Sequence, residues 1–483
     1  MTGADVADDA GGTRARVNPR MTLAVVAFAA LGYSLLQSLV IPALPDIQHR
    51  FGASQGTIAW VMTGYLLSAA VATPIVGRLG DMFGKDRMLR VVLVVLIAGT
   101  LLSALASSIG VLILGRVIQG VGGGVFPLAY GIVRDELPPK KIPGSLGFLS
   151  SLLGIGSAVG LVLAGVIVEQ LNYHWLFWVP FGMTVLALIA AWLWVPPSPV
   201  KVPGRINWAA AALMSFGLSA ALIAVTQSDS WGVGSPKTLG LFAFGLLLMA
   251  SWVQVELRSD TPVIDMHMMR LRGVWTTNLV AVLYGVGMYA SFLVTPMLVQ
   301  EPTSTGYGFG SSIVEAGMYQ APAALGMFFA GQFAGAIERR VGSKPPLLLA
   351  CVLATIAFVM FATMRSEPWE IYVANTIVGL ALGLAFAAMV NLIVQNVRQD
   401  QTGAASGVNT VVRMLGGAIG AQVAATILTT SVAGGSPTEG AFTLVYVVCA
   451  IAALGAALAA LLIPSSARRA ITSRVVSSAP ERA

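Results

Sequence analysis

The sequence has little charge, cysteine or histidine, and each shortage excludes a class of protein. Asp, Glu, Lys and Arg together make up 10% of its 483 residues, whereas a soluble domain carries about 25%. The two cysteines, Cys351 and Cys449, lie inside apolar runs. They lack the CxxC spacing of a metal or redox site and are too few for a disulfide framework. The three histidines are scattered along the chain, and we therefore expect no metal site.

Sequence signatures of enzymes are also missing. There is no G-x-x-x-x-G-K-[ST] phosphate loop, no H-E-x-x-H and no G-x-S-x-G. The longest polar stretches, at the two ends and around 256–273, are too short for a soluble domain. A membrane-embedded enzyme acting on lipids would need a cluster of His, Asp or Ser at one membrane face, and the sequence offers none. We expect a protein that is not an enzyme, that has no cofactor and that does not hydrolyse ATP.

Long apolar runs take the place of these features. Hydrophobic residues make up 56% of the chain, and the mean hydropathy is +0.82. A helix needs about 20 apolar residues to cross the hydrocarbon core of a membrane, and such runs recur throughout the chain. We predict an all-α integral membrane protein with 14 transmembrane helices, at about 21–44, 56–76, 91–108, 111–132, 144–168, 174–195, 207–226, 238–255, 274–298, 311–336, 346–364, 370–393, 404–428 and 440–463.

Lysine and arginine are distributed unevenly among the predicted loops. If the N-terminus is cytoplasmic, 23 of the 28 fall on the cytoplasmic side, and only Arg50, Lys237 and Arg365 fall in outer loops. Arg116 and Arg413 lie inside spans, and Arg413 matches no motif. Because these residues concentrate in cytoplasmic loops, we predict that both termini are cytoplasmic. The net charge of +7 then faces anionic membrane lipids, and we expect no binding of nucleic acid.

Glycines recur at a nearly constant offset, which indicates an internal duplication. Gly77 and Gly84 pair with glycines 258 residues later, and further pairs have offsets of 259 or 260: Gly120 with Gly379, Gly124 with Gly383, Gly144 with Gly403, Gly147 with Gly407, Gly156 with Gly416 and Gly160 with Gly420. Parallel repeats with a site at their interface are common in secondary transporters. The predicted parts are a cytoplasmic disordered tail (1–20), an N-terminal six-helix bundle (21–200), two extra central helices with a loop (201–273), a C-terminal six-helix bundle (274–465) and a cytoplasmic tail (466–483).

The stretch GRLGDMFGKDRML, residues 77–89, lies between the second and third predicted spans. It resembles the signature G-x-L-a-D-r-x-G-r-k-x-x-l of the major facilitator superfamily. Fourteen spans narrow the resemblance to the drug:proton antiporter branch (multidrug efflux type), which has two extra central helices. Three further stretches are similar to motifs of that branch: WVMTGYLL (60–67), LGRVIQGVGGG (114–124) and SSIVEAGMYQAP (311–322). The resemblance covers about residues 21–465.

This resemblance implies a secondary active transporter that works by alternating access. Such a protein would export hydrophobic or cationic small molecules across the inner membrane in exchange for protons, and it would function as a monomer among membrane lipids. Leu36 stands where the branch commonly has an acidic residue, and Leu161 where its fifth-span motif has proline. A weakly proton-coupled facilitator is therefore one alternative, and an exporter of lipids or cell-envelope precursors is another.

The resemblance also implies roles for single residues inside the spans. Arg116 lies in the fourth span, where a charge is costly, and we expect it to tune a proton-carrying carboxylate and help bind substrate. Glu315 and Asp46 are the other candidates for proton coupling. Aromatic and amide groups suit large amphipathic ligands. The candidates for the substrate cavity are Tyr33, Gln37, Tyr65, Arg116, Gln119, Asn278, Tyr284, Tyr289, Phe292, Asn375 and Asn391.

The fifth span carries a helix-packing motif of small residues, Gly156, Gly160 and Gly165. Glycines spaced about four residues apart let two helix backbones approach closely in a membrane. We expect this span to pack against a helix of the other half of the molecule.

A cytoplasmic gate motif is formed by Gly77, Arg78, Gly80, Asp81, Gly84, Lys85 and Arg87. We expect Asp81 to meet either the positive N-terminus of a neighbouring helix or an arginine such as Arg87, and thereby to latch the cytoplasmic side shut. The corresponding position of the second repeat is Arg339. The latch is therefore predicted to be asymmetric and stronger in the first half.

Overall fold

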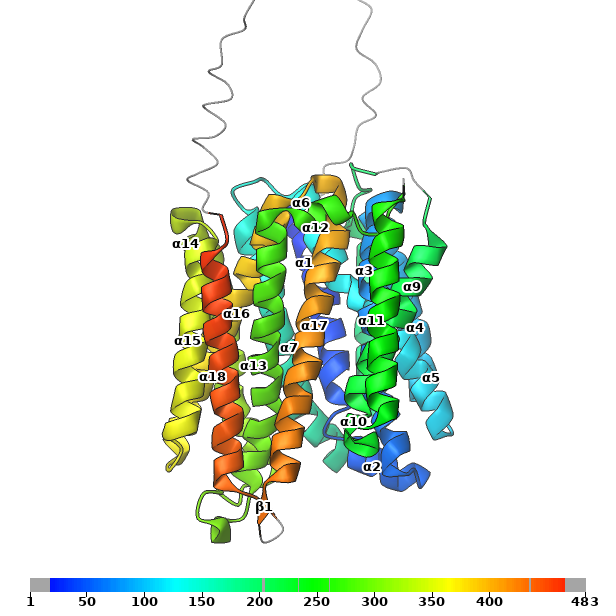
Figure 1. Ribbon diagram of the computed structural model, residues 1–483. Helices are drawn as coiled ribbons and strands as arrows, with labels where there is room; N and C mark the ends of the chain where they lie inside the picture. Colours follow the sequence, from blue (N-terminus) through cyan, green and yellow to red (C-terminus); the bar gives the residue numbers. More distant parts are fainter. Residues whose placement is uncertain (1–17, 202–204, 233, 260, 434–435, 465–483) are drawn as a thin grey trace, which may run out of the picture.

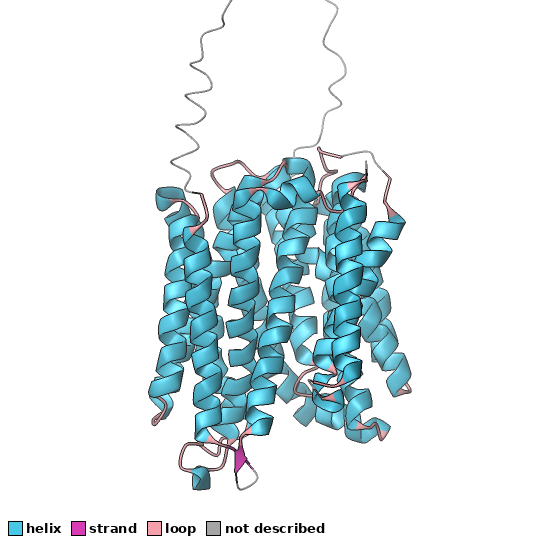
Figure 2. Ribbon diagram, viewed as in Figure 1, coloured by secondary structure: helices cyan, strands magenta, loops and turns pink. Residues whose placement is uncertain are grey.

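The computed structural model describes residues 18–201, 205–232, 234–259, 261–433 and 436–464. Most of the two predicted tails, 1–20 and 466–483, lies outside these residues. The described chain is a bundle of long, roughly parallel and antiparallel helices (Figure 1). Its strands are the two-residue β1 and β2, which pair antiparallel in one short hairpin (Figure 2): Val432–Ala433 and Ser436–Pro437.

The helices form two groups, and a smaller set of helices lies between the two groups in the sequence. The first helix group consists of α1 (Pro19–Leu39), α2 (Leu44–Phe51), α3 (Gln55–Phe83), α4 (Lys85–Ala104), α5 (Ile109–Gly120), η1 (Val121–Gly124), α6 (Val125–Glu136), α7 (Ile142–Gln170) and α8 (Trp175–Trp194). The set between the groups consists of α9 (Trp208–Thr226), α10 (Ser228–Trp231), α11 (Pro236–Leu257) and α12 (Met266–Arg270). The second helix group consists of α13 (Arg272–Gln300), η2 (Thr303–Thr305), α14 (Ile313–Val341), α15 (Lys344–Thr363), α16 (Pro368–Asn396), η3 (Gln399–Gln401), α17 (Thr402–Thr430) and α18 (Glu439–Leu461).

Twelve helical segments of the described chain are long and apolar enough to cross a membrane, with α5, η1 and α6 counted as one segment. Two further helices, α7 and α14, contain 29 residues each. The prediction of an all-α, multi-pass membrane protein is confirmed. Helix α1 begins and helix α18 ends at one end of the bundle, which we call the termini end, and the opposite end is the far end (Figure 1).

Short polar side chains and glycine set the helix boundaries. The Ser54 hydroxyl accepts a hydrogen bond from the backbone N–H of Thr57 at 3.2 Å, and a Ser or Thr caps four other long helices in the same way: α5, α11, α14 and α18. Such caps satisfy backbone donors that a helix leaves unpaired. Gly84 separates α3 from α4 at a φ of 105°, which glycine adopts without a steric penalty.

Each helix group has its own apolar core. In the second group one cluster of buried residues runs from Val280 to Ile463. In the first group two clusters lie mainly between Val25 and Val195, and Val390 and Val394 of α16 join one of them. Helices α9 and α11 pack against each other, and α9 also contacts α3 and α17. We call α9 to α11 the central hairpin.

The two groups cross at two places that are equivalent under the predicted duplication. A Cβ atom on Gly77 would lie 2.3 Å from the carbonyl oxygen of Gly403, and one on Gly335 would lie 2.1 Å from the Cα atom of Gly144. Such distances leave room only for glycine. Because Gly77 pairs with Gly335 and Gly144 with Gly403 in the repeat, the same contact is made twice, by α3 with α17 and by α14 with α7. This relation supports the duplication.

Candidate functional site

Arg116 is fully buried in α5 and is held by neutral groups. Its Nη1 donates a hydrogen bond to Oε1 of Gln119 at 2.8 Å, and its Nε donates to the carbonyl oxygen of Val61 at 3.3 Å. The guanidinium carbon lies 4.2 Å from the centroid of the Tyr65 ring, a cation–π arrangement. These contacts orient the cation without neutralising it.

Aromatic rings of the first helix group lie next to this cation, and one ring of the second group lies within electrostatic reach of them. Tyr33 of α1 and Tyr65 of α3 are buried and stack with ring centroids 6.4 Å apart, and Phe126 of α6 packs edge-on against Tyr33 at 6.2 Å. Tyr289 of α13 lies within electrostatic reach of both tyrosines. We call Tyr33, Tyr65, Phe126 and Tyr289 the aromatic layer. Of the predicted cavity residues, the structure thus brings together Tyr33, Tyr65, Arg116, Gln119 and Tyr289.

Arg413 is a second buried cation and comes from the other helix group. It lies in α17 with 6% of its surface exposed, and its guanidinium carbon is 4.1 Å from the ring centroid of Phe386. Tyr130 of the first group and Tyr289 of the second are within electrostatic reach. Among the described residues, Arg413 has no hydrogen-bond acceptor and no carboxylate partner. It therefore stands at the interface with its charge unpaired.

The two acidic candidates for proton coupling lie far from these arginines along the helices. Glu315 is exposed in the first turn of α14 and closes a capping box, in which its Oε2 accepts a hydrogen bond from the backbone N–H of Ser312 at 2.7 Å. Asp46 is exposed in the first turn of α2. Both lie at the far end as helix-start residues. Their part in proton coupling stays a prediction.

Several other predicted cavity residues hold helices together within the second group. Asn409 of α17 donates a hydrogen bond to Oδ1 of Asn278 in α13 at 2.9 Å, and Asn375 of α16 donates to the carbonyl oxygen of Tyr319 in α14 at 2.8 Å. Tyr284 is buried in the apolar core of the group. The sequence signal for a cavity, an amide or ring in a span, does not separate such packing residues from ligand-facing ones.

The remaining cavity candidates lie in other surroundings. Asn391 of α16 donates to the carbonyl oxygen of Pro143 at 3.3 Å, so it joins the two groups near the α7–α14 crossing. Phe292 of α13 has 37% of its surface exposed. Gln37 is half-buried in α1, four residues after Tyr33 and thus one helical turn away.

The buried carboxylate of Asp81 closes the termini end by capping a helix of the other group. Its Oδ1 accepts a hydrogen bond from the backbone N–H of Gly403 at 3.2 Å, and its Oδ2 accepts one from Ala404 at 3.0 Å. These are N–H groups of the first turn of α17, where the helix dipole favours a negative charge. The first of the two predicted partners, a helix N-terminus, is the one that the structure shows. The other, Arg87, is exposed.

Lys85 of the same motif is fully buried between two carboxylates. Its Nζ lies 2.8 Å from Oδ2 of Asp135 and 3.8 Å from Oδ1 of Asp81. Gly80 lets α6 approach, because a Cβ atom there would lie 2.3 Å from Cδ2 of Leu128. Arg78 is half-buried and within electrostatic reach of Asp81. Removing one partner of such a buried ion pair strongly destabilises the protein, because the other charge stays buried without compensation.

Arg134 and Asp135 extend the closure, and sequence reasoning missed them. Arg134 donates to the hydroxyl of Thr402 at 2.6 Å and to the carbonyl oxygens of Val397 and Arg398 at 2.9 and 3.1 Å. Gln399 donates to Oδ1 of Asp135 at 2.9 Å. With the bonds of Asp81 and Asn391, seven hydrogen bonds between described residues join the two groups, and these seven lie at the termini end. The sequence feature that could have indicated them is the pair of adjacent charged residues, Arg134 and Asp135, directly after the fourth apolar run.

The fifth span, α7, packs against α14 of the other group as expected, but the glycines of the helix-packing motif face a helix of their own group. Cβ atoms on Gly156 and Gly160 would lie 2.5 Å and 1.9 Å from side-chain atoms of Ser34 and Ser38, and both serines belong to α1 of the same group. Gly165 has open space around it. Helix α7 does pack against α14 of the other group, but through Gly147, whose Cβ atom would lie 2.7 Å from the carbonyl oxygen of Gly331.

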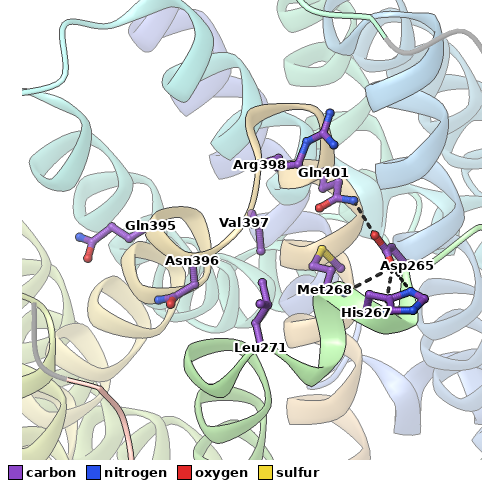
Figure 3. A pocket seen from close by; sticks show the side chains of 9 residues that line it. All are labelled: Asp265, His267, Met268, Leu271, Gln395, Asn396, Val397, Arg398 and Gln401. Carbon is purple, nitrogen blue, oxygen red and sulfur yellow. Dashed lines mark hydrogen bonds and ion pairs between the residues drawn. The ribbon is translucent and has the colours of Figure 1, made fainter. Parts of the chain in front are cut away.

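A polar pocket of about 420 Å³ lies at the termini end, between α12 and the segment that joins α16 to α17 (Figure 3). Asp265 tethers the two walls, because its Oδ2 accepts a hydrogen bond from the Gln401 amide at 3.0 Å. Partial burial would raise the pKa of Asp265, but hydrogen bonds from the backbone of His267 and Met268 and from Gln401 lower it overall. The carboxylate is therefore ionised at neutral pH, and it links the chain before α13 to the start of α17.

Long apolar helices in two repeat-related groups, joined by hydrogen bonds at one end and with buried cations among them, define a membrane transporter fold. The chain belongs to the Major Facilitator Superfamily, whose family model matches residues 26–421. It is 28% identical over 386 residues to a multidrug resistance protein B homolog of Mycobacterium tuberculosis (strain ATCC 25618 / H37Rv), which covers 78% of this chain and 70% of that protein.

Two other relatives and one solved structure are similar over most of the chain. The multidrug transporter protein MdtP of Bacillus subtilis (strain 168) is 25% identical to this chain over 405 residues. The matched residues cover 81% of this chain and 72% of MdtP. The tetracenomycin C resistance and export protein of Streptomyces glaucescens is 25% identical over 427 residues, which cover 88% of this chain and 78% of that protein. The crystal structure of the human organic anion transporter MFSD10 (TETRAN) matches with a TM-score of 0.64 at 17% identity, over 91% of this chain and 99% of that one, which shows the shared fold.

Proposed function

We propose that this transporter is a fourteen-span efflux protein that exports amphipathic small molecules by alternating access. The observation that carries the proposal is the position of two buried arginines: Arg116 lies inside the first helix group beside the aromatic layer, and Arg413 lies in α17 within reach of both groups, while hydrogen bonds join the groups at the termini end. Relatives that are named for multidrug resistance or export support the efflux role. Helices α7 and α14 supply the thirteenth and fourteenth spans, because each has 29 residues and packs inside the bundle.

The orientation follows from the basic residues. At the far end the described chain carries only Arg50, Lys237 and Arg365 in its loops and helix starts, and the other lysines and arginines outside the spans lie at the termini end. The termini end is therefore proposed to be cytoplasmic. The closed termini end then corresponds to a conformation in which the cytoplasmic gate is shut, and opening it would break the contacts of Asp81 with α17.

Proton exchange is proposed to involve Glu338, in the last turn of α14. The Ser343 hydroxyl donates to its Oε2 at 2.6 Å, and its buried Oε1 has no hydrogen-bond partner in the described chain. An ionised carboxylate with an unpaired oxygen in such a place is costly, and a proton on that oxygen removes the cost. The group lies beside Asn391, whose amide joins the two helix groups.

Among the described residues, no cation compensates Glu338 in the way that Lys85 compensates Asp81. Arg339 and Arg340 of α14 are exposed, and Lys344 of α15 donates to two backbone carbonyl oxygens at the end of α18, at 2.7 and 2.6 Å. On α16 the groups that face it are the neutral amides of Asn391 and Gln395. On α7 the carbonyl oxygen of Pro143 accepts a hydrogen bond from this Asn391 amide at 3.3 Å.

The proposal is tested with the purified protein in proteoliposomes. Transport of fluorescent dyes is followed after a pH gradient is imposed across the vesicle membrane, and again after the gradient is collapsed. We expect dye to move against its gradient only while the pH gradient persists. Equal movement with and without the gradient would rule out proton exchange, and no movement of any dye would rule out efflux of this class of compound.

A further inference from the structure

The charges inside the bundle are of one sign. Each Asp and Glu of the described chain lies in a loop, in a short helix or 3-10 turn, or in the first or last turn of a long helix. Arg413, by contrast, lies eleven residues inside α17, about 16 Å from its start at about 1.5 Å per residue. Arg116 lies seven residues inside α5, about 10 Å from the far end. Two buried arginines therefore share the interior with no carboxylate.

Burying a cation in the interior of the bundle without a nearby negative charge costs free energy. A buried charge without its partner destabilises a protein by several kcal/mol, and charged groups within membrane spans mark binding sites or ion pathways. Arg116 has an amide, a carbonyl group and a tyrosine face to orient it. Arg413 has only the face of Phe386 and neighbouring tyrosines. The counter-charge that would complete Arg413 is not found among the described residues.

We propose that the substrate supplies this counter-charge, so that the transported compound is an amphipathic aromatic anion whose acidic group pairs with Arg413. This inference rests on the proposed efflux function and names its substrate class. The planar guanidinium of arginine binds carboxylate and sulfonate oxygens with two parallel hydrogen bonds. The aromatic layer next to it offers ring faces to the body of the substrate. Arg116, whose guanidinium lies over the Tyr65 ring, contributes a second positive charge to that layer.

The position of Arg413 between the groups fits a substrate site that alternates. Phe386 and Tyr289 belong to the second helix group and Tyr130 to the first, and all three lie around the guanidinium. A bound anion would thus contact both groups at once. For a cationic compound the same place is unfavourable, because Arg116 and Arg413 repel it and no carboxylate of the described residues lies there to attract it. This inference therefore differs from the sequence expectation of hydrophobic or cationic substrates.

Two xanthene dyes of opposite charge test the proposal, since fluorescein is an anion and rhodamine 123 a cation on closely similar rings. Binding of each dye to the full-length protein in detergent is measured by fluorescence anisotropy. The variants are Arg413→Gln and Arg413→Lys, and the exposed Arg340→Gln is the matched control. We expect fluorescein to bind at least tenfold more tightly than rhodamine 123. Its Kd should rise at least tenfold in Arg413→Gln, recover partly in Arg413→Lys and stay unchanged in Arg340→Gln.

Competition separates an aromatic anion from a simple inorganic one. Naphthalene-2-sulfonate should displace fluorescein at concentrations where inorganic sulfate does not. The proposal is overturned if rhodamine 123 binds as tightly as fluorescein, if Arg413→Gln binds fluorescein like the parent protein, if sulfate competes equally well, or if neither dye binds. Fluorescein binding that depends on Arg413 without transport in proteoliposomes would instead overturn the efflux function and leave the anion site standing.

Discussion

The carboxylate of Asp81 in α3 accepts a hydrogen bond at 3.0 Å from the backbone N–H of Ala404, in the first turn of α17. This contact joins two helices from different groups, and both of its partners are buried. A hydrogen bond to a charged group contributes about 1.5–3 kcal/mol, and 1.4 kcal/mol corresponds to a factor of ten in an equilibrium. The contact between the two groups at the termini end therefore depends strongly on the charge at this one position.

The first prediction concerns Asp81→Asn, which keeps the shape and removes the charge. The population with a closed termini end should fall at least tenfold, and transport should fall with it. The distance between spin labels at Arg87→Cys and Arg340→Cys, both exposed sites, reports the opening in a background where the buried Cys351 and Cys449 are replaced by alanine. Asp46→Asn, at an exposed carboxylate of the far end, is the control and should leave the distance unchanged. An unchanged distance in Asp81→Asn would show that the contact is not a latch.

The second prediction concerns the crossing of α3 and α17. A Cβ atom in Gly77→Ala would lie 2.3 Å from a backbone carbonyl oxygen, so the helices must separate. We expect the closed conformation to be lost and transport to fall at least tenfold, at normal abundance in the membrane. Gly165→Ala introduces the same atom into open space and should transport normally. Normal transport by Gly77→Ala would mean that this close approach is not needed.

The third prediction concerns Arg116. Its removal in Arg116→Ala leaves the buried Gln119 amide oxygen without its donor, at about 1–3 kcal/mol for an unsatisfied buried group, and also removes the additional hydrogen bond to the Val61 carbonyl oxygen. The melting temperature should fall and transport should fall at least tenfold. Arg116→Lys keeps the charge but lacks the planar fork, so it should restore little. Transport at the parental rate by Arg116→Ala, at equal abundance, would reduce the residue to a packing role.

The fourth prediction concerns the pH dependence of transport. Glu338→Gln cannot take up or release a proton, so the transport rate should no longer change with the pH gradient while dye binding persists. Glu315→Gln alters an exposed helix cap and should preserve the dependence on the gradient. A Glu338→Gln variant that still concentrates dye in response to the gradient would place the proton site elsewhere.

The fifth prediction concerns the tether between Asp265 and Gln401. Hydrogen bonds lower the pKa of Asp265, so the ionised form that accepts them contributes stability above the ordinary aspartate pKa of about 3.9. That stability is lost only as the pH falls through the lower folded value. Hydrogen exchange of residues 397–402 should therefore be constant from neutral pH down to about 4, after correction for the intrinsic rate. Gln401→Ala should raise it throughout that range, and equal protection in both proteins would contradict the tether.

The helix pattern could be predicted from the sequence because a membrane imposes a simple rule on span length and hydropathy. The apolar run at 207–226 corresponds to α9 at Trp208–Thr226, and Gly84 lies at the boundary between α3 and α4. The contact of Asp81 with a helix N-terminus was also predictable, since few groups in an apolar interior attract a carboxylate. Its particular partner on α17 was not named in advance, because the contact joins positions more than 320 residues apart.

The candidate site was predicted only in part, because a span pattern says nothing about the direction in which a side chain points. Tyr284 and Tyr289 are five residues apart in α13, yet one lies in the core of the second helix group and the other reaches the aromatic layer. Glu315 belongs to a sequence motif, yet its side chain caps its own helix. Arg413 belongs to no motif, yet it is a buried cation without a carboxylate partner among the described residues. Burial and partners decide such cases, and both depend on how the helices rotate against one another.

The central hairpin has one more consequence. Because α9 touches both α3 and α17, it covers one of the two equivalent crossings, and the hairpin lies on that side of the bundle (Figure 1). In a membrane, the hairpin would stand between the lipid tails and the α3–α17 crossing, whereas the α7–α14 crossing would lack this cover. The two sides of the seam between the groups would then present unlike surfaces to the bilayer.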